Sequence, residues 1–176
     1  MLEESTEPPN ERRRNVRVLV VAGPAGSGKT TAGRALAARW GWAFADADDL
    51  HAPEARAKMS AGAGLTDADR APWLGRLAAL VRERATLGPP TVLACSALTR
   101  AYRQRLSGAG VALVWLDVPP GLLRRRLERR PGHFAGAELL PSQLATAEPP
   151  APEEGALVLR ADRPLAALLR EVEGWL

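Results

Sequence analysis

Residues Gly23 to Thr30 read G-P-A-G-S-G-K-T, which matches the pattern G-x-x-x-x-G-K-[ST]. An apolar run at 16–22 precedes them and a helical pattern follows, as this motif requires. Glycines let the backbone turn its N–H groups toward phosphate oxygens, and the N-terminal end of the next helix adds positive potential. The pattern therefore predicts a phosphate-binding loop, in which Lys29 reaches the β- and γ-phosphates and the Thr30 hydroxyl binds Mg²⁺.

We expect a bound nucleotide to contact this whole loop and the first residues of the helix. The expected nucleotide-binding residues are Gly23, Pro24, Ala25, Gly26, Ser27, Gly28, Lys29, Thr30 and Thr31. Motors, switches, transporter ATPases and small-molecule kinases all use such a loop. The acceptor of the phosphate therefore has to be inferred from residues elsewhere in the chain.

Carboxylates follow the second predicted strand, "AFADAD" at 43–48, whereas the run "TVLACSA" at 91–97 carries no acid. If strand 43–48 lies beside the phosphate-loop strand, its carboxyl end faces the phosphates. Asp46 and Asp48 are two apart on an extended segment and would then point to the same side. We expect Asp46 to hold the metal and Asp48 to take the proton of an attacking hydroxyl. The alternative is a solvated loop whose acids cap a helix.

Five apolar segments predict strands, and helical stretches lie between them. The predicted strands are 16–22, 43–48, 91–97, 111–118 and 156–161. The clearest helix covers 67–86, where Thr66 and Asp69 form a capping pair, and others are expected at 119–130 and 163–175. Because parallel neighbours need crossover connections, this alternation predicts an α/β fold with a parallel sheet.

The length and composition favour one domain. A chain of 176 residues that is 46% hydrophobic can bury one good core, so we expect a flexible tail at 1–14 and one domain over 15–176. The single cysteine, Cys95, excludes an intrachain disulfide, and a buried inert thiol is expected. No stretch has the character of a membrane span or a signal peptide, which indicates a soluble cytoplasmic protein.

The net charge of +4 comes almost wholly from arginine. It is compatible with a nucleic-acid partner, an acidic small substrate or solvated helix faces. The basic residues are spread along the chain and few aromatic residues lie among them, which argues against nucleic acid. The segment 129–155 is rich in Pro, Gly and Ala, and it predicts either a lid or a disordered loop.

Together, several segments resemble the gluconate kinases, small P-loop kinases of the shikimate-kinase-like and nucleoside-monophosphate-kinase-like group. The resembling segments occur in the family's order and are 23–31, 46–51, 58–74, 95–106 and 130–150. The resemblance implies transfer of the γ-phosphoryl group of ATP to the 6-hydroxyl of D-gluconate, with Mg²⁺ as cofactor. It also implies a three-layer α/β/α fold with a parallel five-stranded sheet, a lid at about 129–141 and often a homodimer.

Gluconate is a small polyol anion, so its site needs a cation for the carboxylate and polar partners for the hydroxyls. With the resemblance, the expected substrate-binding residues are Asp48, His51, Lys58, Arg70, Ser96, Arg103 and His133. Arg103 is the preferred carboxylate clamp, because a guanidinium can form two parallel bonds. The expected catalytic residues are Lys29, Asp48, Arg126 and Arg130, and the two arginines would approach the transferring phosphate on lid closure.

The chain departs from the family pattern at two positions. Thr99 stands where a lysine is usual, so either Arg100 compensates or that lysine is not essential. Pro131 stands where a basic residue is usual. Two alternatives stay open: a non-catalytic ATP-binding switch, and a related kinase that acts on shikimate, a nucleoside monophosphate or another sugar acid.

Overall fold

The computed structural model describes residues 14–61, 63–129 and 137–176. Its five strands form a parallel sheet in the order β2-β3-β1-β4-β5. The strands are β1 (Val18–Ala22), β2 (Ala43–Asp46), β3 (Thr91–Ala94), β4 (Val111–Asp117) and β5 (Leu157–Arg160). The predicted α/β fold with a parallel sheet is therefore confirmed.

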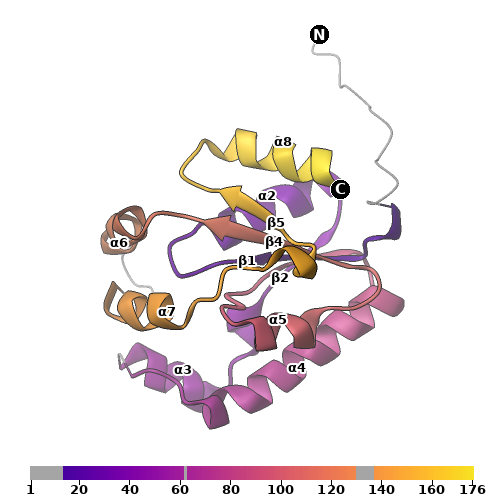
Figure 1. The fold of residues 1–176 in the computed structure, drawn as a ribbon. Helices are drawn as coiled ribbons and strands as arrows, with labels where there is room; N and C mark the ends of the chain where they lie inside the picture. The colour runs from indigo at the N-terminus through magenta and orange to yellow at the C-terminus, as the bar shows by residue number, and fades with distance from the viewer. Residues whose placement is uncertain (1–13, 62, 130–136) are drawn as a thin grey trace.

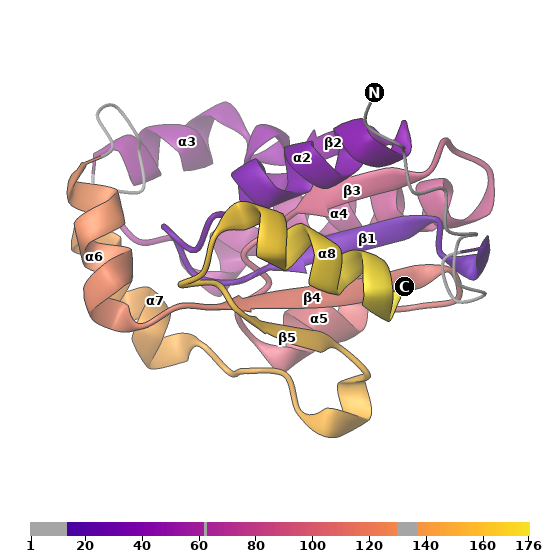
Figure 2. The same ribbon diagram turned by 90° about the horizontal axis from the view of Figure 1, so that it is seen from above.

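Helices cover both faces of this sheet. The α-helices are α2 (Lys29–Trp40), α3 (Pro53–Ser60), α4 (Asp67–Thr86), α5 (Arg100–Leu106), α6 (Pro120–Glu128), α7 (Leu140–Thr146) and α8 (Leu165–Trp175). Helices α2 and α8 lie on one face, α4 and α5 lie on the other, and α3, α6 and α7 gather at one end (Figures 1 and 2). Among the described helices, none combines the length and apolar character needed to cross a bilayer.

The core has two halves, one on each face of β1. Leu19 and Val21 pack into the half shared with α2 and α8, whereas Val18 and Val20 pack into the half shared with α4. Successive side chains of a strand point to opposite faces, and both faces here are covered. This explains why β1 reads as a continuous apolar run. The central strand is thereby fixed on both sides, and the loop that follows it begins from a rigid position.

Helix α4 begins and ends as its sequence predicts. The Thr66 side chain accepts a bond from the Asp69 amide, and the Asp69 carboxylate accepts one from the Thr66 amide. This reciprocal capping box satisfies two amides that the first turn leaves unpaired. The buried stripe of Leu74, Leu77 and Val81 then packs against the sheet, so α4 presents its N-terminal turn to one side of the site.

Two expectations about the second strand are wrong. Strand β2 pairs with β3, which separates it from β1, so it does not lie beside the phosphate-loop strand. Asp48 is not on an extended segment, because the chain turns after Asp46 into a 3-10 helix, η1 (Ala47–Leu50). The Asp46 side chain caps that turn, and this explains the change from strand to helix.

Candidate active site

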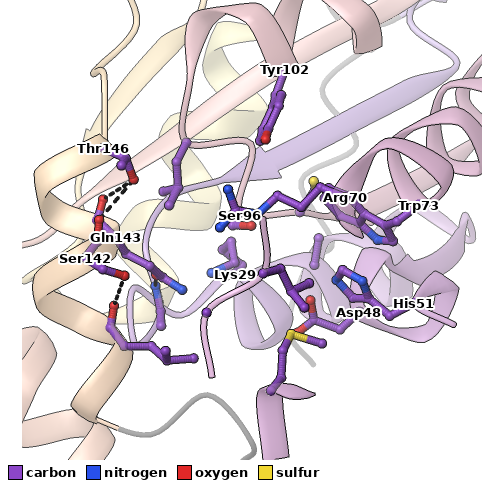
Figure 3. A pocket seen from close by; sticks show the side chains of 18 of the residues that line it. Lys29, Asp48, His51, Arg70, Trp73, Ser96, Tyr102, Ser142, Gln143 and Thr146 are labelled. Carbon is purple, nitrogen blue, oxygen red and sulfur yellow. Dashed lines mark hydrogen bonds between the residues drawn. The ribbon is translucent and has the colours of Figure 1, made fainter. Parts of the chain in front are cut away.

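A cavity of about 560 Å³ opens at the carboxyl ends of the strands. This is where open α/β sheets bind ligands. Figure 3 draws His51, Arg70 and Trp73 on one side of the cavity, the α7 residues Ser142, Gln143 and Thr146 on the other, and Lys29 and Ser96 between them. The phosphate loop therefore shares one cavity with Asp48, His51, Arg70 and Ser96, which are four of the residues expected to bind the acceptor.

The loop between β1 and α2 has the backbone that a phosphate site needs. Gly23, Gly26 and Gly28 have positive φ angles of 140°, 80° and 98°. A Cβ atom at Gly23 would lie 2.9 Å from the carbonyl oxygen of Leu116, so a larger residue does not fit there. Lys29 follows at the first turn of α2, and its Nζ donates to the carbonyl of Pro24 at 2.9 Å. The loop is thus built around backbone N–H groups and one ammonium.

Asp46 links this loop to η1. Its Oδ2 accepts a hydrogen bond from Thr30 Oγ1 at 3.0 Å, and its Oδ1 accepts one from the Asp48 amide at 3.1 Å. Asp48 also lines the cavity. A hydroxyl and a carboxylate at contact distance fit Mg²⁺, which kinases hold through few protein groups together with substrate phosphates. The described residues contain no cluster of three or more His, Cys, Asp or Glu that would hold a metal by themselves.

The imidazole ring of His51 lies uncharged in the cavity wall. Its ring stacks on Trp73 with centroids 4.7 Å apart and planes 5° apart, and Trp73 Nε1 donates to the carbonyl of Ala47 at 2.7 Å. Burial, helped by the charges of nearby arginines, lowers the pKa of His51 to about 4. Its buried Nδ1 has no hydrogen-bond partner within the described part of the chain. Trp73 is therefore both a core residue and the support of a site residue.

Two other cations expected to bind substrate, Arg70 and Lys58, differ in their surroundings. Arg70 lines the cavity, and within the described residues its one ion pair is a loose contact at 3.6 Å with the highly exposed Asp67. Lys58 is not among the lining residues, and its Nζ donates to Asp69 at 2.7 Å. This bond, with those from Thr66, lowers the pKa of Asp69 to about 2. In this structure Lys58 therefore joins α3 to α4, and its contact with substrate stays a prediction.

Arg103 is not placed as a carboxylate clamp, and this corrects the prediction. Its side chain is 2% exposed, and its Nε and Nη2 donate to the two carboxylate oxygens of Glu154 at 2.7 and 2.8 Å. These bonds lower the pKa of Glu154. Arg103 lies outside the cavity lining, and the guanidinium edge that could bind a substrate carboxylate is already bonded to Glu154.

Arg126 donates hydrogen bonds to backbone carbonyls of the phosphate loop. Its Nη1 donates to the carbonyls of Gly26 and Ser27 at 3.3 and 3.4 Å, and its Nη2 donates to that of Ala161 at 3.0 Å. It does not line the cavity, so contact with a transferring phosphate stays a prediction. Arg130, Pro131 and His133 lie outside the described residues.

Thr99 replaces the usual lysine with a helix cap. Its hydroxyl accepts a hydrogen bond from the Tyr102 amide at 3.3 Å, and the residue also lines the cavity. Arg100 lies outside the cavity lining and its Nη1 pairs with Glu153 at 2.9 Å, which favours the alternative that the lysine is not essential. Ser96, in contrast, lines the cavity, and its contact with substrate stays a prediction.

The sequence did not single out the wall that α7 contributes. Gln143 accepts a hydrogen bond from the Ala25 amide of the phosphate loop at 2.8 Å through its Oε1, and Ser142 and Thr146 line the cavity beside it. Polar residues at 142, 143 and 146 have the spacing of one helix face. This spacing indicates a polar helix face, but the surrounding Pro and Ala residues made the segment resemble a loop in the sequence.

Comparisons with known proteins agree with this geometry. A family model described as an AAA domain matches residues 18–150. A gluconokinase of Gluconobacter oxydans is 46% identical over 158 residues, which cover 89% of each chain. The thermosensitive gluconokinase of Escherichia coli is 37% identical over 142 residues, which cover 80% of this chain and 76% of the relative.

Solved structures give the same result. An unliganded sugar kinase of Janibacter has a TM-score of 0.84 at 42% identity, covering 91% of this chain and 94% of its own. A gluconokinase of Sinorhizobium meliloti has a TM-score of 0.78 at 40% identity, with 90% of each chain covered. The chain therefore belongs to the gluconokinase family of P-loop kinases, within the group that the AAA domain model describes.

Proposed function

We propose that this enzyme transfers the γ-phosphoryl group of ATP to the 6-hydroxyl of D-gluconate, giving 6-phospho-D-gluconate and ADP. The observation that carries the proposal is one cavity lined by the phosphate loop, by Asp46 and Asp48, and by a polar wall that includes Ser96, Ser142 and Gln143. Similarity to gluconokinases over most of the chain supports gluconate as the acceptor. A switch that only binds nucleotide needs no such polar wall beside its loop.

The residues of the loop divide the work of holding the donor. Lys29 and the loop amides neutralise and orient the phosphates, and Thr30 with Asp46 would hold Mg²⁺. Bound Mg²⁺ supplies positive charge against the charge that develops on the phosphates. Phosphoryl transfer is mostly a matter of such positioning and charge.

On the acceptor side, Asp48 takes the proton of the attacking hydroxyl and Arg70 holds the gluconate carboxylate. Asp48 is suited to this because its backbone is tied to Asp46, which also contacts Thr30. Arg70 is suited because it lines the cavity and, in the part of the chain that the structure describes, its one ion pair is the loose, exposed one with Asp67. The neutral ring of His51 can both donate to and accept from a polyol hydroxyl.

The reaction is tested with purified protein, Mg·ATP and a panel of sugar acids, shikimate and nucleoside monophosphates. We expect ADP release to depend on gluconate and the phosphorylated product to carry its phosphate at position 6, as read by phosphorus NMR. Turnover with shikimate or a nucleoside monophosphate instead of gluconate would assign the chain to a different acceptor. ADP release that no acceptor accelerates would favour the switch.

Replacing Asp48 tests the proposed base. For Asp48→Asn we expect kcat to fall by about a hundredfold or more, since a positioned base contributes on that scale. The KM for ATP should stay within about twofold, because the amide keeps the shape of the site. Asp49→Asn is the matched control, since Asp49 is 78% exposed, pairs with Arg56 and lies outside the cavity lining. If both variants turn over like the wild type, Asp48 is not the base.

Replacing Arg70 tests the carboxylate clamp. For Arg70→Ala we expect the KM for gluconate to rise by about tenfold or more, because a hydrogen bond between charged groups is lost. Steady-state kinetics at saturating ATP provide the measurement. Arg82→Ala, which removes an exposed arginine further along α4, should leave that KM unchanged. Equal KM values for the two variants would remove Arg70 from the substrate site.

The depressed pKa of His51 predicts a pH effect on stability. The folded protein disfavours protonated His51, so its contribution is fully present above about pH 6.5 and is lost as the pH falls from about 6.5 to about 4. Thermal unfolding across this range should therefore show a steeper fall in Tm for the wild type than for His51→Gln. His133→Gln, at the only other histidine, should follow the wild type. A fall in His51→Gln as steep as in the wild type contradicts the assignment.

A further inference from the structure

The turn between β3 and α5 has a backbone conformation that L-residues disfavour. Ala97 has a φ of 39°, and it is the one non-glycine residue with positive φ in the described part of the chain. Ala97 itself is 1% exposed, whereas its neighbours Ser96, Leu98 and Thr99 line the cavity. The direction of these three side chains therefore depends on an unfavourable angle that other groups must maintain.

Arg103 is the side chain that holds this turn. Its Nη1 donates to the carbonyl oxygens of Ala97 and Leu98, both at 3.2 Å. The rest of the guanidinium is fixed by Glu154, and the group also lies over the ring of Trp115 at 5.5 Å from its centroid. The planar fork makes four contacts here, to two carbonyls and to both oxygens of a carboxylate, whereas an ammonium has three donors and no fork geometry.

Glu154 connects the turn to the chain segment that follows α7. It lies in the short 3-10 helix η3 (Pro152–Glu154), and its Oε1 also accepts a hydrogen bond from the Ala151 amide at 3.0 Å. Earlier in the same segment, Glu148 accepts a bond from the Arg100 amide at 2.6 Å and donates its own amide to Leu98 at 2.9 Å. The acceptor-side turn and the segment leaving α7 are thus fastened together.

We infer that Arg103 and Glu154 are positioning residues for the phosphoryl acceptor: they hold the Ser96–Thr99 turn so that Ser96 faces the substrate. This inference rests on the proposed function, and neither residue touches substrate. It gives Arg103 a role through the backbone of the turn, in place of the direct grip that its residue type suggests. The pair also differs from its neighbour Arg100–Glu153, which joins the same two elements at 2.9 Å but is exposed.

That neighbour supplies a matched control for the experiment. We expect Glu154→Gln to raise the KM for gluconate by about tenfold while the KM for ATP stays within about twofold, and Glu153→Gln to resemble the wild type. A merely structural pair would lower the fraction of folded enzyme and hence the apparent kcat, but it would not change the KM of the molecules that remain folded. Equal gluconate KM values for Glu154→Gln and Glu153→Gln would overturn the inference.

A second variant keeps the test decisive if Glu154→Gln does not fold. Arg103→Lys retains a cation beside Glu154 but lacks the fork that reaches Ala97 and Leu98, so it should raise the gluconate KM in the same way. Adding Ala97→Gly to either variant should restore much of the loss, because glycine adopts positive φ without steric cost. Failure of both the KM rise and the glycine rescue would leave the pair without a positioning role.

Hydrogen exchange separates this inference from the proposed function. The Gly23 amide donates to the carbonyl of Ser96 at 3.2 Å, and the Glu148 amide donates to that of Leu98. Both amides should exchange faster in Glu154→Gln than in Glu153→Gln, whatever the acceptor is. If the wild type does not phosphorylate gluconate but these amides respond, the substrate assignment fails and the positioning role stands. If the wild type is active and neither the amides nor the KM respond, the positioning role fails.

Discussion

The carboxylate of Asp46 is the point on which the arrangement of this site depends. One oxygen accepts from the Thr30 hydroxyl at the start of α2, and the other accepts from the Asp48 amide in η1. The first contact lies in the half of the cavity formed by the phosphate loop, and the second lies in the half formed by η1, where we propose that the acceptor is activated. A single side chain at the end of β2 therefore sets the distance between the two halves.

The sheet order determines how this carboxylate is delivered. Strand β3 lies between β1 and β2, so the phosphate loop and Asp46 start from strands that do not pair with each other. They meet because α2 crosses from β1 toward β2, and its first turn brings Thr30 to Asp46. Strand β3 itself carries no acid. Cys95, which follows the strand, is buried, and Ser96 is the first polar side chain of this segment to reach the cavity.

Features encoded by neighbouring residues could be predicted from the sequence. The phosphate loop, the capping box of Thr66 and Asp69 and the alternation of strands and helices each depend on short-range patterns, and the structure contains all three. Their residue type and place after a strand singled out Asp46 and Asp48, and both line the cavity, although β2 is not the neighbour of β1 and Asp48 is not on an extended segment. Local patterns predict helices, strands and loops, but they do not determine which strands pair.

Roles that depend on distant partners could not be predicted in the same way. A guanidinium suits a substrate carboxylate and a protein carboxylate equally well, and Glu154 lies 51 residues beyond Arg103. The same reasoning applies to Lys58 and Asp69, and to the amide of Ala25, whose partner Gln143 is 118 residues away. The neutral state of His51 follows from burial against Trp73, which becomes visible only when the chain is folded.

The buried thiol beneath the site has a consequence for oxidative chemistry. Cys95 is 2% exposed, and burial, as the main cause, raises its pKa to about 12. Near neutral pH this thiol stays almost entirely protonated, and the thiolate is the nucleophile that attacks peroxides and disulfides. Because Cys95 is also the single cysteine of the chain, peroxide has no reactive thiolate to modify next to Asp46 and Asp48. Oxidation of Cys95 is therefore a slow route to damage at this site.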